Sequence, residues 1–203
     1  MNVQSPTVAP KSPIAAKDRI LHTAHTLFYR DGIRATGIDL IIKQAGVTKV
    51  TFYRHYSSKD ALILAFLHYR HQRWMAWFSQ ALGRYSAELP LPAALASTLL
   101  EWFTGEDFRG CAFINSTLEY AVPLPEVREL SVTHKRDMAK AVEGYLAESD
   151  GMSDQAECVA LLIDGAIVKA QMENQAQPAV RFMQHMLEIL IRQWSTKAGA
   201  DNE

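Results

Sequence analysis

Apolar residues recur at helical spacing from Ala15 onward. In the segment AAKDRILHTAHTLFYRDG, residues Ile20, Ala24, Leu27 and Phe28 fall on one face of a helix. No stretch alternates apolar and polar residues as a half-buried strand does, and no internal repeat appears. Turn clusters separate eight further helices, predicted at about residues 36–45, 49–56, 58–85, 93–103, 112–121, 126–148, 154–175 and 179–196. The pattern therefore predicts an all-α fold of about nine helices.

The second and third predicted helices are joined by the sequence AGVT (residues 45–48). Thr36 and Thr48 are residue types that cap helix starts. Gly46 permits a sharp turn, because glycine adopts backbone conformations that other residues avoid, and Val47 can fill the core beneath it. Two short helices joined in this way predict a helix-turn-helix, a motif that places its second helix in the major groove of DNA.

The third predicted helix has two different faces on a helical wheel. One face is expected to anchor the helix to the core and is formed by Thr48, Phe52, His55 and Tyr56. The opposite face is expected to enter a DNA groove and is formed by Val50, Tyr53 and Arg54, with Lys49 at its flank. Helix starts near Thr36, near Thr48 and at Ser57 or Ser58, together with the threonine hydroxyls, His55 and Lys59, are suited to bind phosphate.

Charge is distributed unevenly along a chain whose formal net charge is only -1. Residues 11–59 contain nine Lys and Arg but only three Asp, so the excess of basic residues falls on the predicted helix-turn-helix. The rest of the 203-residue chain is acidic. A basic end joined to an acidic body is typical of a protein that binds a polyanion such as DNA.

Common catalytic and metal-binding motifs are absent from the sequence. It contains no GxGxxG, P-loop, GxSxG, HExxH or CxxC. Two histidine pairs at i, i+3 spacing, His22 with His25 and His68 with His71, lack a neighbouring carboxylate or cysteine that would complete a metal site. We therefore expect no enzyme activity, no metal and no cofactor.

Cysteine usage and the N-terminal sequence indicate the compartment. Cys111 and Cys158 form neither a disulfide framework nor a metal pattern. The start MNVQSPTVAPKSPIAA is polar and proline-rich, unlike a signal peptide, and no run approaches the roughly 18 apolar residues of a membrane span. We expect a cytoplasmic protein without membrane contact.

The segment IRATGIDLIIKQAGVTKVTFYRHYSSKDALILAFL closely resembles the N-terminal DNA-binding domain of TetR-family transcriptional regulators. The match covers about residues 15–67 and includes AGV followed by Ser or Thr, then T-[FLIV]-Y-x-[HY]-[FY]. The resemblance implies base contacts from Lys49, Val50 and Tyr53. It implies phosphate or mixed contacts from Thr36, Thr48, Thr51, Arg54, His55 and Lys59.

Two positions depart from the family pattern. Asp39 stands where a basic or neutral residue is common, and it either accepts from a cytosine amino group or faces solvent. Val50 stands where glycine is commoner, and its methyl groups are suited to contact thymine.

Because a single helix-turn-helix covers only a half-site, the resemblance implies a homodimer that binds a palindromic operator in double-stranded DNA. The last two predicted helices carry apolar residues at helical spacing, and Gly165 permits close approach of a partner helix. The predicted dimer interface comprises Leu161, Gly165, Val168, Met172, Phe182, Met186, Ile189 and Leu190.

The resemblance also implies a small-molecule effector that binds beside the long fourth helix and releases a repressor from DNA. Aromatic and Met residues crowd this region, and the candidate pocket residues are Trp74, Phe78, Phe103, Asn115 and His134. Two alternatives stay open: a helix-turn-helix protein without a sensor, which activates transcription or organises DNA, and a thiol-based redox or electrophile sensor acting through Cys111. A buried structural cysteine is the simpler interpretation of Cys111.

The domain organisation follows from these assignments. Residues 1–14 carry three prolines with Ser and Thr and predict a disordered arm. Residues 15–60 form the predicted helix-turn-helix domain, and residues 61–197 form the predicted ligand-binding and dimerisation domain.

Overall fold

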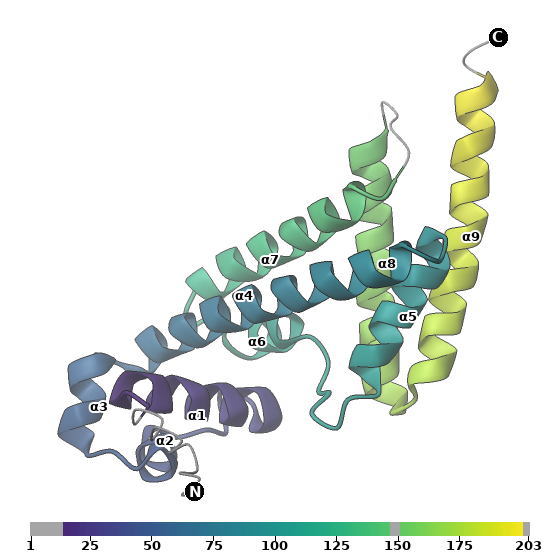
Figure 1. Cartoon of the computed structure of the whole chain (residues 1–203). Helices are drawn as coiled ribbons and strands as arrows, with labels where there is room; N and C mark the ends of the chain where they lie inside the picture. Colours follow the sequence, from purple (N-terminus) through teal and green to yellow (C-terminus); the bar gives the residue numbers. More distant parts are fainter. Residues whose placement is uncertain (1–13, 147–150, 201–203) are drawn as a thin grey trace, which may run out of the picture.

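The computed structural model describes residues 14–146 and 151–200, and the side chains of this part up to residue 196 (Figure 1). The described residues form helices and connecting turns, with no strand among them. The helices are α1 (Ala16–Asp31), α2 (Ile38–Ala45), α3 (Lys49–His55), α4 (Lys59–Ser86), α5 (Leu91–Phe103), α6 (Ala112–Tyr120), α7 (Glu126–Glu143), α8 (Met152–Glu173) and α9 (Ala176–Ala200). The all-α prediction is confirmed.

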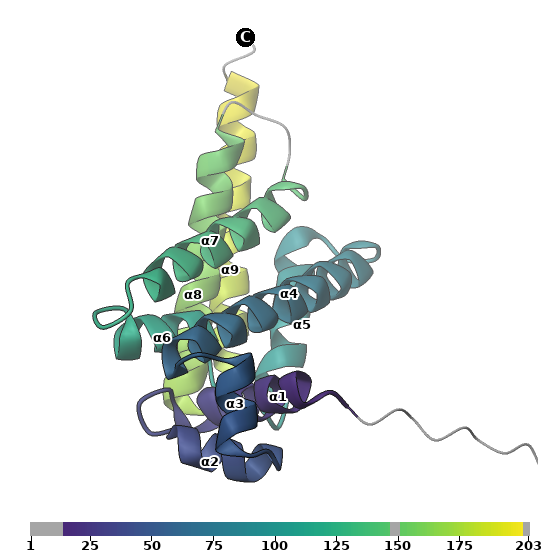
Figure 2. The same cartoon turned by 90° about the vertical axis from the view of Figure 1, so that its left-hand side faces the viewer.

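Helices α1, α2 and α3 form one end of the molecule, which we call the head (Figures 1 and 2). Both α2 and α3 pack against α1, and their apolar faces meet in a common core. That core contains Ile20, Leu27, Ile41 and Phe52, none of which is accessible to solvent. Burying a side chain of this size stabilises the folded state by about 1.5–3 kcal/mol, so these residues determine how the short helices stack.

Helices α4 to α9 form the larger part, which we call the body. Helix α4 extends from the head into the body and packs on α1 at one end and on α5 and α7 further along. Helix α8 packs between α7 and α9, and α9 also packs on α5 (Figure 1). Because α4 packs on α1 as well as on other helices of the body, it connects the head directly to the body.

Most helix boundaries lie within a few residues of their predicted positions. Helix α2 is an exception: it begins at Ile38 with Gly37 at its N-cap, so the prediction that Thr36 caps this helix is wrong. The sequence left Ser57 and Ser58 as alternative N-caps of α4. Ser58 is the cap, because its Oγ accepts from the backbone N–H of Ala61 at 3.0 Å. Helix α7 ends at Glu143, five residues before the predicted boundary.

Two predictions about the chain ends and domains have no test in this structure. The predicted arm at residues 1–14 lies outside the described residues except for Ile14, which is exposed. The domain boundary at residues 60 and 61 falls inside the first turn of α4 and stays a prediction. Among the helices of the described part, none is long and apolar enough to cross a membrane.

Candidate nucleic-acid interface and effector cavity

The turn between α2 and α3 is built around Gly46. This residue has the left-handed backbone conformation, with φ of 62°, and its N–H caps α2 by donating to the carbonyls of Ile42 and Lys43. Side chains other than glycine adopt this conformation at a cost. Arg19 of α1 fixes the turn from outside, because its Nε donates to the carbonyl of Ala45 at 3.1 Å. The predicted helix-turn-helix is therefore present.

Helix α3 is held to the head by two aromatic residues. Phe52 is fully buried, Tyr56 is buried at the C-cap, and their ring centroids are 6.4 Å apart. Thr48 caps the helix start as predicted, since its Oγ1 accepts from the backbone N–H of Thr51 at 3.1 Å. Thr48 and His55 were also expected to face the core, but both are exposed, so that part of the wheel prediction is wrong.

The opposite face of α3 is open to solvent. Val50 is 70% exposed and Tyr53 44% exposed, and Lys49 and Arg54 are exposed beside them. No acidic residue occurs within α3. The Tyr53 ring keeps one edge-to-face contact with Phe52, with centroids 5.2 Å apart, so the phenol is supported without being covered. This face offers cations, methyl groups and a hydroxyl, which are the groups that contact base edges and phosphates.

Two residues predicted to contact phosphate are engaged elsewhere. The Thr36 side chain is fully buried, and its hydroxyl donates to the carbonyl of Gly32 at 2.7 Å, so a phosphate contact from this side chain is a wrong prediction. The Lys59 ammonium donates to the carbonyl of Ile33 at 2.6 Å, and burial lowers its pKa. Both side chains hold the turn between α1 and α2 rather than facing outward. Asp39, by contrast, is exposed on α2.

The other predicted phosphate contacts lie at the surface of the head. Arg54 and His55 are exposed at the end of α3, and the half-buried Thr51 shares a hydroxyl–hydroxyl hydrogen bond of 2.9 Å with Thr48. Together with Lys49, Val50 and Tyr53, these residues lie on the side of α3 that no other described part of the head covers.

Four of the five predicted effector-pocket residues are buried in one aromatic cluster inside the body. Trp74 and Phe78 stack with centroids 4.7 Å apart, and Trp74 lies 5.0 Å from His134. Phe103 joins them through Trp102, whose ring centroid lies 5.4 Å from that of Trp74 and 5.6 Å from that of Phe103. Burial lowers the pKa of His134 to about 2, so its imidazole is neutral. These four side chains fill the interior in this conformation.

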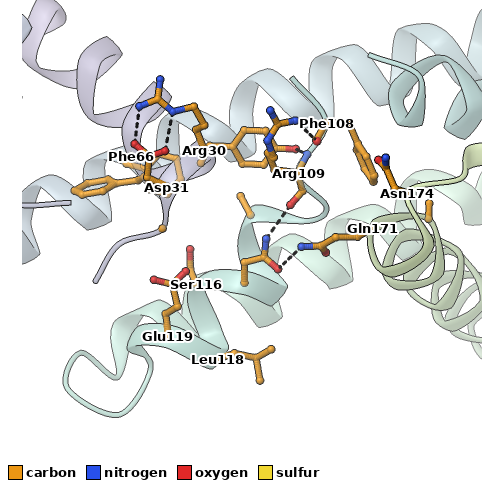
Figure 3. Close-up of a pocket in the computed structure, with 16 residues that line it drawn as sticks. Arg30, Asp31, Phe66, Phe108, Arg109, Ser116, Leu118, Glu119, Gln171 and Asn174 are labelled. Atoms are coloured by element: carbon orange, nitrogen blue, oxygen red, sulfur yellow. Dashed lines mark hydrogen bonds and ion pairs between the residues drawn. The ribbon is translucent and has the colours of Figure 1, made fainter. Parts of the chain in front are cut away.

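Asn115, the fifth predicted pocket residue, lines a cavity of about 690 Å³ between the head and the body (Figure 3). We call it the junction cavity. Its walls come from the end of α1, Phe66 of α4, the loop before α6, α6 itself and the end of α8. Asn115 Nδ2 donates to the carbonyl of Arg109 at 2.9 Å, and Gln171 Nε2 donates to Asn115 Oδ1 at 3.5 Å.

Apart from Asn115, the residues around the junction cavity were not predicted from the sequence. Tyr29, Arg109, Gln171 and Asn174 belong to three separate segments and carry no local motif. Only the fold brings them together. Trp74, Phe78, Phe103 and His134 do not line this cavity, so the predicted pocket set is divided between a packed cluster and an open space.

The predicted dimer residues lie on the outer side of α8 and α9. Leu161 is 74% exposed and Met172 80% exposed, and a Cβ added to Gly165 between them would meet no atom within 4 Å. Val168, Phe182, Met186 and Ile189 are also exposed, whereas Leu190 is half-buried. We call this set the α8–α9 face. Large exposed apolar residues gathered on one face are typical of an interaction surface.

The two cysteines lie at different helices of the body. Cys111 is buried at the N-cap of α6, and Cys158 is exposed on α8. Both are free thiols. Within the described residues, no group of three or more His, Cys, Asp or Glu side chains is arranged to hold a metal ion.

Comparison of the sequence with known families identifies the head. Residues 20–66 match the family described as "Bacterial regulatory proteins, tetR family". The "Uncharacterized HTH-type transcriptional regulator YerO" of Bacillus subtilis (strain 168) is 42% identical over 53 residues, which is 26% of this chain and 18% of that protein. The chain thus matches less than a fifth of the length of this curated relative.

Solved structures extend the similarity to the body. SCO4454, described as a TetR-family transcriptional regulator from Streptomyces coelicolor, is 31% identical with a TM-score of 0.76, and the match covers 88% of this chain and 89% of that one. The multidrug binding protein EbrR, solved in complex with malachite green, is 17% identical with a TM-score of 0.68, over 90% of this chain and 99% of that one. The second likeness concerns the fold alone.

Proposed function

Since the chain belongs to the TetR family of transcriptional regulators, we propose that it is a cytoplasmic repressor that binds a palindromic operator as a homodimer and leaves it when a small molecule binds. The observation that carries this proposal is the open face of α3, which is held rigidly by Phe52 and Tyr56. Lys49, Val50 and Tyr53 would contact base edges, and Thr48, Thr51, Arg54 and His55 would contact phosphates or sugars.

The operator is the first thing to determine. Fragments that bind the full-length protein would be selected from a random duplex pool at a fixed, moderate salt concentration, because phosphate contacts make affinity strongly salt-dependent. An inverted repeat among the selected fragments supports a dimeric reader with half-sites about 34–36 Å apart, or a multiple of this distance. Only weak, salt-sensitive binding without enrichment would contradict the proposed operator recognition by the ligand-free protein.

Substitutions on α3 then test which residues read the sequence. Lys49→Ala or Tyr53→Ala should weaken operator binding by about 1–3 kcal/mol. Both side chains are exposed, so we expect the thermal unfolding temperature to stay unchanged. Lys140→Ala, an exposed lysine on α7, is the matched control. Unchanged affinity in both α3 variants would remove this helix from the reading role.

A second copy of this chain is the proposed occupant of the α8–α9 face. Seven of the eight predicted interface residues are exposed, and the family resemblance implies that these two helices pair with their counterparts in a four-helix interface. Leu161→Glu would place a charge in that interface without an ion partner. We expect the variant to be monomeric by light scattering at micromolar concentration, whereas Leu89→Glu, at an exposed apolar residue between α4 and α5, should stay dimeric. A dimeric Leu161→Glu protein would exclude this face.

The proposed effector binds in the body beside α4, where its occupancy would move α4 and with it the head. The junction cavity supports this idea because its walls include the end of α1 as well as α6 and α8. Screening thermal stability against a panel of metabolites and drugs tests it, because a ligand that binds only the folded state raises stability. A hit should also lower operator affinity. Hits without any effect on DNA binding would favour a regulator without this sensor.

A further inference from the structure

A smaller cavity, with a volume of about 190 Å³, shares Tyr29, Arg30 and Arg109 with the wall of the junction cavity. Its walls come from α1, α4 and the loop between α5 and α6. We call it the arginine cleft and define it by His25, Tyr29, Arg70, Arg73, Asp107 and Arg109. Arg30 also borders it, but its guanidinium is paired with Asp31 at 2.6 Å.

Three guanidinium groups in this cleft have no carboxylate to neutralise them. Among the described residues, no Asp or Glu oxygen lies within 4.0 Å of a nitrogen of Arg70, Arg73 or Arg109. Among the described residues that line the cleft, Asp107 is the single acidic one, so the lining keeps a net positive charge. Gathering like charges is unfavourable for folding, and an anion in the cleft would offset this repulsion.

Each guanidinium is nevertheless held in place by neutral groups. Arg70 lies over the ring of Tyr29, with 4.0 Å from its central carbon to the ring centroid. Arg73 Nη1 donates to the hydroxyl of Tyr69 at 2.8 Å. Arg109 Nη1 donates to the carbonyls of Glu106 and Phe108 at 3.0 and 2.7 Å. Positioned guanidinium groups bind carboxylate and phosphate oxygens well, because little freedom is lost on binding.

Tyr29 connects the three walls. Its hydroxyl donates to the carbonyl of Gly110 at 2.8 Å and accepts from the backbone N–H of Arg109 at 3.1 Å, while its ring supports Arg70. One side chain of the head therefore fixes one arginine from α4 and one from the loop. These contacts fix the walls of the cleft at the junction between the head and the body.

A buried polar atom in the same wall lacks a partner. His25 Nε2 is inaccessible to solvent and makes no hydrogen bond to any described residue. Burial, followed by the charges of Arg70 and Arg73, lowers the pKa of His25 to about 4. Buried polar atoms are nearly always hydrogen-bonded, so an unpaired nitrogen beside Arg70 and Arg73 is an unusual feature of this wall.

We propose that the arginine cleft binds a small oxyanion, namely the carboxylate, sulfate or phosphate group of a small molecule, and that the bound anion joins α1, α4 and the α5–α6 loop. Its effect on DNA binding rests on the proposed function: an anion that links the head to the body in one orientation changes operator affinity, and the operator changes anion affinity by the same factor. The cleft does not include the aromatic cluster, and it shares Tyr29, Arg30 and Arg109 with the wall of the junction cavity.

Nuclear magnetic resonance of the histidine side chains tests binding site by site. The full-length protein would be titrated with sulfate and, separately, with malonate, replacing chloride at constant ionic strength, and His25→Gln would assign the His25 resonance. We expect saturable shifts at His25 and none at His68, which is exposed on α4. Tighter sulfate binding would indicate a sulfate- or phosphate-bearing ligand, and tighter malonate binding a carboxylate.

Matched variants identify the groups that hold the anion. Arg73→Gln and Arg109→Gln should each weaken binding about tenfold, as expected for the loss of one charge-assisted hydrogen bond. Both residues are exposed, so the variants are expected to fold. Arg192→Gln, on the exposed side of α9, should bind the anion as the unchanged protein does. No saturation, or equal binding by all variants, would overturn the proposal.

A DNA-binding experiment distinguishes an error in the proposed anion site from an error in the proposed function. Operator affinity would be compared in sulfate and in chloride at equal ionic strength, for the unchanged protein and for Arg73→Gln. A change that disappears in the variant supports the coupling, and binding at His25 without such a change overturns the coupling while the site stands. If random duplex DNA displaces sulfate from His25, the cleft is a DNA phosphate contact and the small-anion proposal is wrong.

Discussion

His134 of α7 is packed among aromatic rings, and its neighbours explain why it is neutral. Its imidazole stacks on Phe113 with centroids 3.8 Å apart and lies against Trp74. Its Nδ1 is 3.2 Å from Nδ1 of His71, so one imidazole donates to the other. Burial is the main cause that lowers its pKa to about 2, and the charges of Lys135, His71 and Arg70 act in the same direction.

Acid should destabilise the protein through this residue. The unfolded chain binds a proton at His134 near its ordinary pKa of 6.5, whereas the folded chain does so only near 2. The stabilising contribution is therefore complete above pH 6.5 and is lost as the pH falls, by up to about 1.4 kcal/mol per pH unit. His134→Phe keeps the ring stack but cannot bind a proton.

Urea unfolding at pH 7 and pH 5 measures this effect. The free energy of unfolding of the unchanged protein should fall by up to about 2 kcal/mol more than that of His134→Phe over this interval. His68→Phe, at an exposed histidine of α4, should behave as the unchanged protein. Parallel pH dependences for all three proteins would show that His134 does not control acid stability.

At the scale of elements, the helix starts show which local signals matter. Thr48 and Ser58 each accept a hydrogen bond from the backbone N–H three residues later, and their helices begin where they were predicted. Thr36 looks equally suitable in the sequence, yet its hydroxyl bonds back to Gly32 and the helix begins two residues later. A capping residue type is therefore a local preference that tertiary packing can redirect.

The cap of α4 offers a matched comparison of neighbouring serines. Ser58→Ala removes the acceptor for the Ala61 N–H and should lower the free energy of unfolding by about 1 kcal/mol. Ser57→Ala, at an exposed position outside the helix, should change it by less than about 0.5 kcal/mol. Urea midpoints of the two variants measure the difference. Equal midpoints would mean that solvent replaces the cap without loss.

At the scale of the whole molecule, the head joins the body through a few polar contacts as well as through α4. Glu119 of α6 accepts from the backbone N–H of Arg34 at 3.0 Å, and its carbonyl accepts from Arg34 Nε at 2.7 Å. Tyr29 of α1 donates to the carbonyl of Gly110 at 2.8 Å. These contacts fix the orientation of the head, which is the property that an effector must change in the proposed mechanism.

Glu119→Ala should loosen this connection. The variant leaves the Arg34 N–H without its acceptor, and we expect the head to lose about 1 kcal/mol of local stability. Hydrogen exchange of amides in α1 and α2, compared with amides in α7 and α8, measures this loss. Glu106→Ala, in the exposed loop before α6, is the control. Equal protection of the head in both variants would show that α4 alone determines its orientation.

Much of the fold was predictable because its signals are local. Helical periodicity, caps and breakers located the helices to within a few residues, since each depends on neighbours within a turn or two. The open face of α3 was predictable for the same reason: Phe52 and Tyr56 are apolar and face inward, which leaves Val50 and Tyr53 outside. The exposed apolar residues of α8 and α9 also follow from spacing alone.

Local patterns in the amino-acid sequence were thus sufficient to predict the helices, the helix-turn-helix and the family resemblance. Helix packing established which polar side chains face inward, as Thr36 and Lys59 do, and which aromatic residues form a cluster instead of lining a cavity. The junction cavity and the arginine cleft likewise combine segments that are far apart in the chain. Such contacts depend on how helices pack against one another, and no local pattern records the distance between them.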